Sequence, residues 1–228
     1  MVMEPAYEGI LLAFALILGV LFFGWAIGRI PNIPKEFSRK FVHIGVSCFY
    51  FIYADFLYGQ SIWIELALPV TFIAANLYIA LSGKPKALAS ALKGSNRLGT
   101  VYYPISLVFL IVCLRLLDIG MTIDDFGAGV LVMGFGDGLA GLIGSMAGKK
   151  KIPHLPGTKT WLGSAVMFLV SFLVILLVYE GSLAFSSSKI WLYLLCAMIS
   201  TVIEALTPKG LDNLTVPILT AFVCMLVL

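Results

Sequence analysis

Charged side chains are scarce in this 228-residue sequence, where Asp, Glu, Lys and Arg make up 12% and hydrophobic residues 61%. Water-soluble domains contain about a quarter charged residues and about half apolar ones. A soluble core could not bury so much apolar surface, so that class is excluded. Cysteines are also rare, lie within apolar stretches and have no paired spacing, which argues against a disulfide framework or a cysteine metal site: they are Cys48, Cys113, Cys196 and Cys224.

Long apolar runs dominate what is present. A helix needs roughly 20 apolar residues to cross a bilayer, and seven runs have about that length: 7–30, 37–58, 61–81, 100–117, 126–148, 161–179 and 189–206. An eighth run, 214–228, is shorter and would span only with local thinning or tilt. The N-terminus lacks the basic leader of a signal peptide, so the first run is interpreted as a retained helix. The sequence predicts an all-α polytopic membrane helical bundle of seven transmembrane helices plus a short eighth C-terminal segment, in a single membrane domain over residues 1–228.

Basic residues gather on one side of these runs. Short cytoplasmic loops collect Lys and Arg, and of the 15 basic residues all but Arg115 and Lys189 lie in or beside the loops after the first, third, fifth and seventh runs. These include Lys84, Lys86, Lys93, Arg97 and Lys209. The pattern predicts that the N-terminus is outside and that those loops face the cytoplasm.

Two carboxylates, Asp137 and Glu204, lie within apolar runs on the cytoplasmic half. An ionisable group at such depth is costly and usually faces a polar interior, so both are candidate functional residues. Asp137 is followed by Gly141, Gly144 and Gly148 at steps of four, three and four, which forms a helix face without side chains. That face suits either a ligand or close packing of a neighbouring helix. A carboxylate buried without a partner is unfavourable, so replacing Asp137 is expected to preserve stability.

Two basic groups are candidate phosphate ligands. Arg39, Lys40, His43 and Ser47 follow helical spacing, so two cations, an imidazole and a hydroxyl share one face of the second helix. Lys159 lies in a Gly and Thr turn directly before the sixth helix, where exposed backbone N–H groups and the positive end of the helix dipole favour anions. The spacing predicts an anion site on the cytoplasmic side.

A reversal near the end of the chain offers oxygen ligands on the same side. Pro208 and Gly210 predict a turn after the seventh helix, and Asp212 with Asn213 follow it. Mg²⁺ commonly takes one or two carboxylates and completes its shell with water and nucleotide phosphate. These residues, with Asp137, are therefore candidate Mg²⁺ ligands, although Asn213 could instead cap the last helix.

Five motifs occur in one order along the chain: Arg39-Lys-x-x-His43, Gly99-Thr-Val-Tyr-Tyr-Pro104, Gly136-Asp-Gly-x-Ala140 with the spaced glycines, Lys159-Thr-x-x-Gly163-Ser, and Glu204 followed by Asp212-Asn-x-x-Val-Pro217. Together they resemble the dolichol kinase and phytol kinase family of CTP-dependent lipid kinases. The resemblance places a family-like catalytic core over 37–217, after an extra N-terminal helix over 7–30.

The resemblance implies that the segment 137–163 binds CTP. Its candidate nucleotide-binding residues, with Gly141 added from the glycine face, are Asp137, Ala140, Gly141, Gly144, Gly148, Lys159, Thr160 and Gly163. The sequence departs from the family at two places: Leu162 stands where Glu is frequent, and Thr158 where a second Lys is common. The first departure removes a carboxylate and puts the nucleotide preference in doubt.

These observations predict a membrane kinase that moves the γ-phosphate of a nucleoside triphosphate onto the hydroxyl of a long isoprenoid alcohol, such as a polyprenol, dolichol or phytol. CTP as the donor rests on the resemblance. Arg39, Lys40 and Lys159 are expected to bind phosphate. Asp137 and Glu204 are alternative candidates for the catalytic base, with His43 beside them.

Three other functions fit parts of the same pattern. A CTP-dependent diacylglycerol kinase or a lipid cytidylyltransferase would use the same cytoplasmic polar groups on another lipid. A membrane transporter would also carry acidic residues and glycines at depth, but the sequence has no inverted repeat and its polar groups gather at one face. Expected partners are a nucleotide, an isoprenoid alcohol and membrane lipid, with no nucleic acid.

Overall fold

The computed structural model describes residues 5–83, 98–153, 155, 159–183, 185, 188–208 and 210–228, with Lys35 placed by its backbone alone. In chain order the helices are α1 (Pro5–Ile27), α2 (Lys35–Ser47), α3 (Phe49–Ile52), η1 (Tyr53–Leu57), α4 (Ile62–Ser82), α6 (Gly99–Leu116), α7 (Ile123–Leu131), η2 (Val132–Asp137), α8 (Gly138–Ala147), α9 (Trp161–Glu180), α10 (Ile190–Leu206) and α11 (Asp212–Val227). The label η marks a π-helical turn. Within the described residues there is no strand, and the predicted all-α class is confirmed.

The helices account for all eight predicted apolar runs. Within the described part of the chain, six continuous helical segments are long and apolar enough to cross a membrane, which makes this a multi-pass membrane protein. The seventh run forms α10, which has 17 residues, and the eighth forms α11, which has 16. Because α10 is nearly as short as α11, the predicted count of seven full-length spans is not confirmed. The outside position of the N-terminus stays a prediction.

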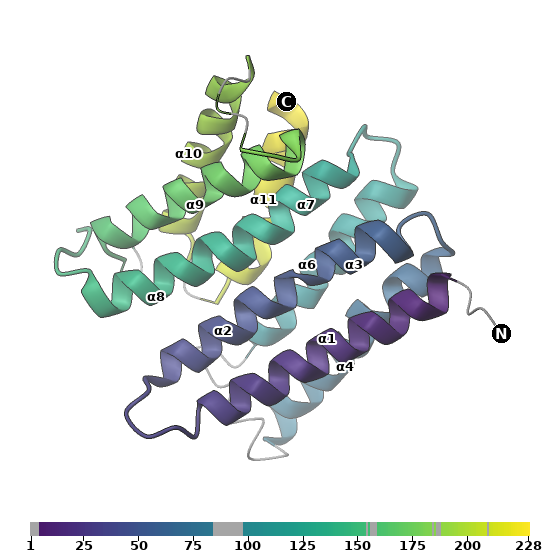
Figure 1. Ribbon diagram of the computed structural model, residues 1–228, viewed down its shortest axis with the longest axis horizontal. Coiled ribbons are helices and arrows are strands. Elements are labelled where there is room, and N and C mark those ends of the chain that lie inside the picture. Colours follow the sequence, from purple (N-terminus) through teal and green to yellow (C-terminus); the bar gives the residue numbers. More distant parts are fainter. Residues whose placement is uncertain are drawn as a thin grey trace.

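The predicted orientation can be tested at two exposed positions. Lys150 follows α8 and Asp118 precedes α7, so the segment α7–η2–α8 separates them along the bundle (Figure 1). In a Cys48→Ser background, Lys150→Cys is expected to react with an impermeant thiol reagent from the cytoplasmic side, and Asp118→Cys from the opposite side. Reversed labelling would contradict the orientation. The basic residues Lys84, Lys86, Lys93, Arg97 and Lys209 lie outside the described residues.

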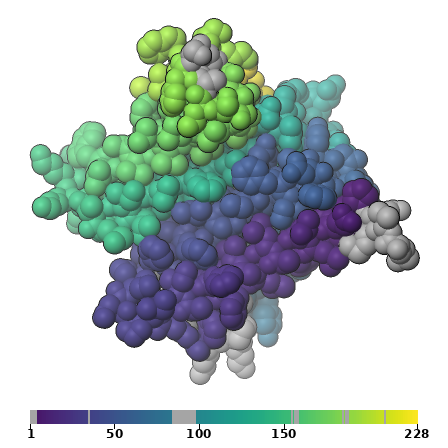
Figure 2. Space-filling model, in the orientation of Figure 1, coloured from purple at the N-terminus to yellow at the C-terminus, as the bar shows by residue number. Residues whose placement is uncertain are grey.

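The segment α7–η2–α8 forms the centre of the bundle. It contacts α2, α9 and α11, and 72% of its spanning window is buried, against 17% for α1. Figure 1 shows it running between α2 on one side and α9 on the other, while Figure 2 shows α1, in purple, on the surface. Phe126 of α7 packs on Tyr53 with ring centroids 4.8 Å apart. Asp137 therefore lies on the most buried of the six candidate membrane spans in the described part of the chain.

A π-helical turn, η2, ends at Asp137 within this central segment. Its glycines let neighbouring helices approach closely: a Cβ at Gly134 would overlap Ser47 of α2, and one at Gly136 would crowd Met167 and Ser171 of α9. A π-turn changes the phase of the helix that follows it, and such turns are frequent at functional sites. Here the phase change precedes the residues that face the polar site.

Candidate active site

Lys40 of α2 reaches the central segment and binds Asp137. Its Nζ lies 2.6 Å from Asp137 Oδ2 and 3.0 Å from the Asp137 backbone oxygen, and Lys40 is 4% exposed. The lysine stem crosses Gly141, where a Cβ would overlap Lys40 Cε. The expectation that Asp137 is buried without a partner was therefore wrong, because α2 brings a cation from 97 residues earlier in the chain.

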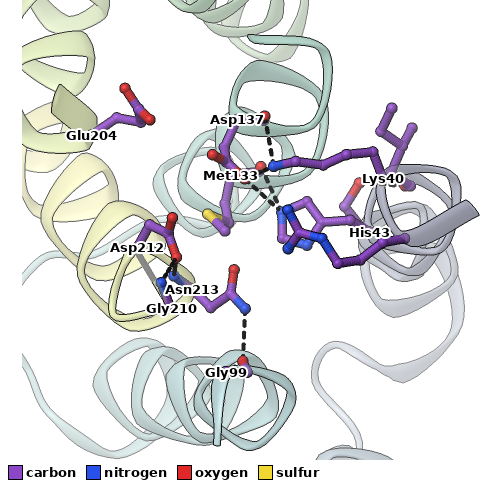
Figure 3. A network of polar contacts seen from close by, with 12 residues as sticks. Lys40, His43, Gly99, Met133, Asp137, Glu204, Gly210, Asp212 and Asn213 are labelled. Carbon is purple, nitrogen blue, oxygen red and sulfur yellow. Dashed lines mark hydrogen bonds and ion pairs between the residues drawn. The ribbon is translucent and has the colours of Figure 1, made fainter. Parts of the chain in front are cut away.

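His43, one turn after Lys40, supports the same carboxylate. Its Nε2 lies 3.3 Å from Asp137 Oδ2 and 3.2 Å from the Met133 backbone oxygen (Figure 3). Both neighbours accept hydrogen bonds, so Nε2 is assigned as the protonated nitrogen. Ser47 does not join this group, because its hydroxyl donates to the Ile44 carbonyl oxygen 2.7 Å away in its own helix. The predicted polar face of α2 therefore reaches only as far as His43.

Lys159 is held in place by backbone contacts just before α9. Residues 151 and 160 form an isolated antiparallel bridge, and the backbone N–H of Ile152 donates to the Lys159 oxygen at 3.0 Å. Lys159 Nζ then donates to the Glu204 backbone oxygen at 2.9 Å and to its carboxylate. Thr160 caps α9 by accepting from the Gly163 backbone N–H at 3.1 Å. The structure thus brings Lys159 to the end of α10.

The glycine face divides between two roles. Gly144, Gly148 and Gly163 lie where α8 meets the start of α9, and an added Cβ at any of them would crowd Thr160. Close helix packing is therefore one role of these three glycines, and Gly144 and Gly163 also line the cavity described below. Gly141 instead makes room for the Lys40 stem. Gly148 is extended and lies just beyond the end of α8, so the helical strip ends one residue earlier than expected.

Asp212 and Asn213 begin α11 after the predicted reversal, in which Gly210 has φ +100°. Asp212 Oδ1 accepts from the backbone N–H groups of Gly210 at 2.9 Å and Asn213 at 3.0 Å. Asn213 Nδ2 donates to the Gly99 oxygen at 2.6 Å, which ties α11 to the first turn of α6 (Figure 3). Asn213 therefore links two helices and does not cap its own.

A cavity of about 290 Å³ opens among these elements. Its described lining includes three cations and four carboxylates, and the full set is Glu36, Arg39, Lys40, Asp137, Ala140, Gly141, Gly144, Ser145, Lys159, Thr160, Gly163, Ser164, Glu204 and Asp212. Among the predicted site residues, His43, Gly148 and Asn213 lie outside this lining. The cavity gathers residues from α2, α8, α9, α10 and α11 at one end of the bundle.

Sequence reasoning missed three lining residues: Glu36, Ser145 and Ser164. Each lies four positions from a predicted site residue, namely Lys40, Gly141 or Thr160. The i, i+4 rule would have found them. Glu36 accepts from Arg39 Nε at 3.1 Å, so this cation also has a carboxylate partner.

Of the two departures from the family pattern, only Leu162 falls within the described residues. Leu162 is 40% exposed and is absent from the described lining, so the Leu that replaces a frequent Glu does not face the cavity. Thr158 lies outside the described residues.

The predicted Mg²⁺ ligands do not form a complete site by themselves. Among the described residues, no three His, Cys, Asp or Glu side chains lie close enough to hold a metal ion. Asp137 and Asp212 nevertheless line the same cavity. Asp212 Oδ2 has no hydrogen bond within the described part of the chain, since its backbone donors use Oδ1. This arrangement fits Mg²⁺ bound by one or two carboxylates together with phosphate and water.

Two buried carboxylates elsewhere show what a structural role looks like in this fold. Glu65 accepts from Arg115 Nε at 2.8 Å and from the Gly59 backbone N–H at 3.2 Å. Asp125 completes a capping box with Thr122 at the start of α7. Neither lines the cavity. The four carboxylates around the cavity differ from Glu65 and Asp125 because their side chains line one common cavity.

Proteins named as phytol kinases are similar to this chain over most of its length. It is 29% identical over 228 residues to "Phytol kinase" of Synechocystis sp., which covers 96% of this chain and 91% of that protein. It is 29% identical over 206 residues to "Phytol kinase 1, chloroplastic" of Arabidopsis thaliana, which covers 82% of this chain and 65% of that protein. No family model and no solved structure matches the chain. The resemblance indicated by the five motifs is confirmed by these homologues.

Proposed function

We propose that this protein is a membrane kinase that transfers the γ-phosphate of a nucleoside triphosphate, CTP, to the hydroxyl of an isoprenoid alcohol of the phytol type. The observation that carries the proposal is the cavity at one end of an apolar bundle, lined by Arg39, Lys40 and Lys159 together with carboxylates. The homologues named phytol kinase support a lipid kinase of the prenol type. The choice of CTP rests on the motifs that resemble the CTP-dependent family.

The cations of the cavity suit the phosphate groups of a nucleotide. Each has a carboxylate partner: Arg39 binds Glu36, Lys40 binds Asp137 and Lys159 binds Glu204. These pairs orient the side chains before nucleotide binds, and phosphate oxygens would then compete for them. Because the described lining holds more carboxylates than cations, a triphosphate would enter more favourably together with a divalent cation. Mg²⁺, with Asp212 and Asp137 as candidate ligands, would neutralise the transferred phosphoryl group.

Asp137 is the better candidate for the base that accepts the proton of the alcohol. It lies between Lys40 and His43, whereas Glu204 is bound to Lys159 on the opposite wall. When Lys40 moves to phosphate, Asp137 is left with His43 as its donor and can accept the hydroxyl proton. Since His43 donates through Nε2, we assign it to orienting the carboxylate.

The contribution of Lys159 can be measured directly. Lys159→Met is expected to raise KM for CTP about 10- to 100-fold, because one charge-assisted hydrogen bond to the nucleotide is lost. The change in kcat is expected to be smaller. Lys159→Arg should recover part of the affinity because it keeps the charge. Lys151→Met, at the exposed residue that forms the isolated bridge with Thr160, is the matched control. A Lys159→Met enzyme with the KM of the parent would remove Lys159 from the phosphate site.

The proposal is tested with purified protein, several nucleoside triphosphates and a panel of phytol, longer prenols and diacylglycerol. Turnover with CTP and a prenol is expected, with little product from diacylglycerol. Preference for diacylglycerol would replace the proposed acceptor. Nucleotide-independent movement of a solute across reconstituted vesicles, without phosphorylation of any lipid, would favour the transporter alternative.

A further inference from the structure

Tyr103 of α6 carries a buried hydroxyl that has no hydrogen-bond partner within the described residues. The residue is 8% exposed, and it belongs to the apolar core. A buried phenol usually finds a partner, because leaving its hydroxyl unpaired is unfavourable. Phe would pack in the same space without this penalty. The motif that contains Tyr103, over 99–104, has no role in the phosphate site described above.

Tyr103 lies next to the polar site. Its ring and that of His43 have centroids 6.0 Å apart, and His43 in turn contacts Asp137 Oδ2 at 3.3 Å. His43 therefore contacts both the Tyr103 ring and the Asp137 carboxylate. α2 packs mainly on α1 and on the central segment, whereas α6 packs mainly on α4 and α11. The two rings thus meet between two helices that have few other direct contacts with each other.

The first turn of α6 is held from two sides, which fixes the direction of Tyr103. Asn213 of α11 donates to the Gly99 oxygen at 2.6 Å. Pro104 has no N–H to offer the Thr100 oxygen, and Asn76 of α4 donates to that oxygen at 2.9 Å instead. The backbone just before Tyr103 is therefore anchored to both α4 and α11. The unpaired hydroxyl is a built feature of the site.

We propose that Tyr103 binds the hydroxyl of the acceptor alcohol beside His43, the residue that contacts the candidate base Asp137. This inference rests on the proposed function and names the subsite where the lipid would react. A prenol offers one hydroxyl, both donor and acceptor, on an apolar chain, which matches a neutral phenol in apolar surroundings. A nucleotide phosphate would instead require cations, and those line the cavity, whose described lining does not include Tyr103. The alcohol would enter from the membrane along the α2–α6 boundary.

The test combines one substitution with one change to the ligand. In the parent, phytol is expected to raise the melting temperature of the detergent-purified protein more than phytene, the hydrocarbon without the hydroxyl. In Tyr103→Phe, the two ligands should give equal shifts, because the partner of the hydroxyl is gone. The neighbouring Tyr102→Phe is the matched control and should retain the difference. A Tyr103→Phe protein that distinguishes the two ligands as the parent does would overturn the subsite.

Turnover provides the second readout. Tyr103→Phe is expected to raise KM for phytol about tenfold, because one hydrogen bond to the hydroxyl of the alcohol is lost. KM for CTP is expected to stay within about twofold of the parent value. Equal increases in both KM values would indicate general disruption of the fold and overturn the assignment. The binding measurement needs no turnover. A parent that binds phytol through Tyr103 but phosphorylates no alcohol would therefore contradict the proposed function while leaving the alcohol subsite in place.

Discussion

Asp137→Asn is expected to lower kcat for alcohol phosphorylation by about 100-fold or more, equivalent to roughly 3 kcal/mol of transition-state stabilisation. The amide keeps the size of the side chain but cannot accept the alcohol proton or bind Mg²⁺ as an anion. Steady-state turnover with saturating CTP and phytol measures the effect. The carboxylate is within 3.3 Å of His43 and 2.6 Å of Lys40, so its loss also changes both neighbours.

A second variant separates catalysis from folding. Asp137→Asn leaves Lys40, which is 4% exposed, without its counter-charge, and that should lower the melting temperature. Lys40→Met combined with Asp137→Asn removes both charges and should restore much of the stability. Activity is expected to remain low in the double variant. If the double variant instead regains nearly the activity of the parent, the Lys40–Asp137 pair is structural and the base must be sought at Glu204.

Asp212→Asn is expected to shift the Mg²⁺ dependence of the reaction. An amide oxygen can still accept from the backbone N–H groups of Gly210 and Asn213, so the start of α11 should be preserved. Losing the negative charge should weaken binding of the hard cation, and turnover at limiting Mg²⁺ is expected to fall about 100-fold, with partial recovery at high Mg²⁺. A Mg²⁺ titration of initial rates measures this.

Asp212→Ala serves as the comparison for that titration, because it removes both the charge and the hydrogen bonds of the turn. It should lose stability as well as activity. An Asp212→Asn enzyme with the half-saturating Mg²⁺ concentration of the parent would exclude Asp212 as a metal ligand and leave it a residue of the turn.

The lengths of the apolar runs predicted the fold well because a helix needs roughly 20 apolar residues to cross the bilayer. All eight runs are helical, and most boundaries agree within a few residues. The seventh run also agrees within one residue, but its helix, Ile190–Leu206, is shorter than a typical span. The π-turn that ends at Asp137 left no sequence signal. It depends on how α2 and α9 pack against Gly134 and Gly136.

The residue types in the sequence predicted which residues form the candidate site. They did not predict which of these residues contact one another. Lys40, Asp137, Lys159, Glu204 and Asp212 were all singled out, and all line one cavity. The pairing of Lys40 with Asp137 could not be predicted because 97 residues separate them and only helix packing brings them together. Their functional roles remain predictions until variants are measured.

The chemistry of the lipid product tests the central claim most directly. Purified protein would be incubated with phytol, Mg²⁺ and CTP labelled at either the α- or the γ-phosphate. The account predicts that the γ-label alone appears in the lipid fraction as phytyl phosphate, with an equal amount of CDP released. Label from the α-phosphate in the lipid would indicate cytidylyl transfer, and either that result or an unlabelled lipid fraction would contradict the account.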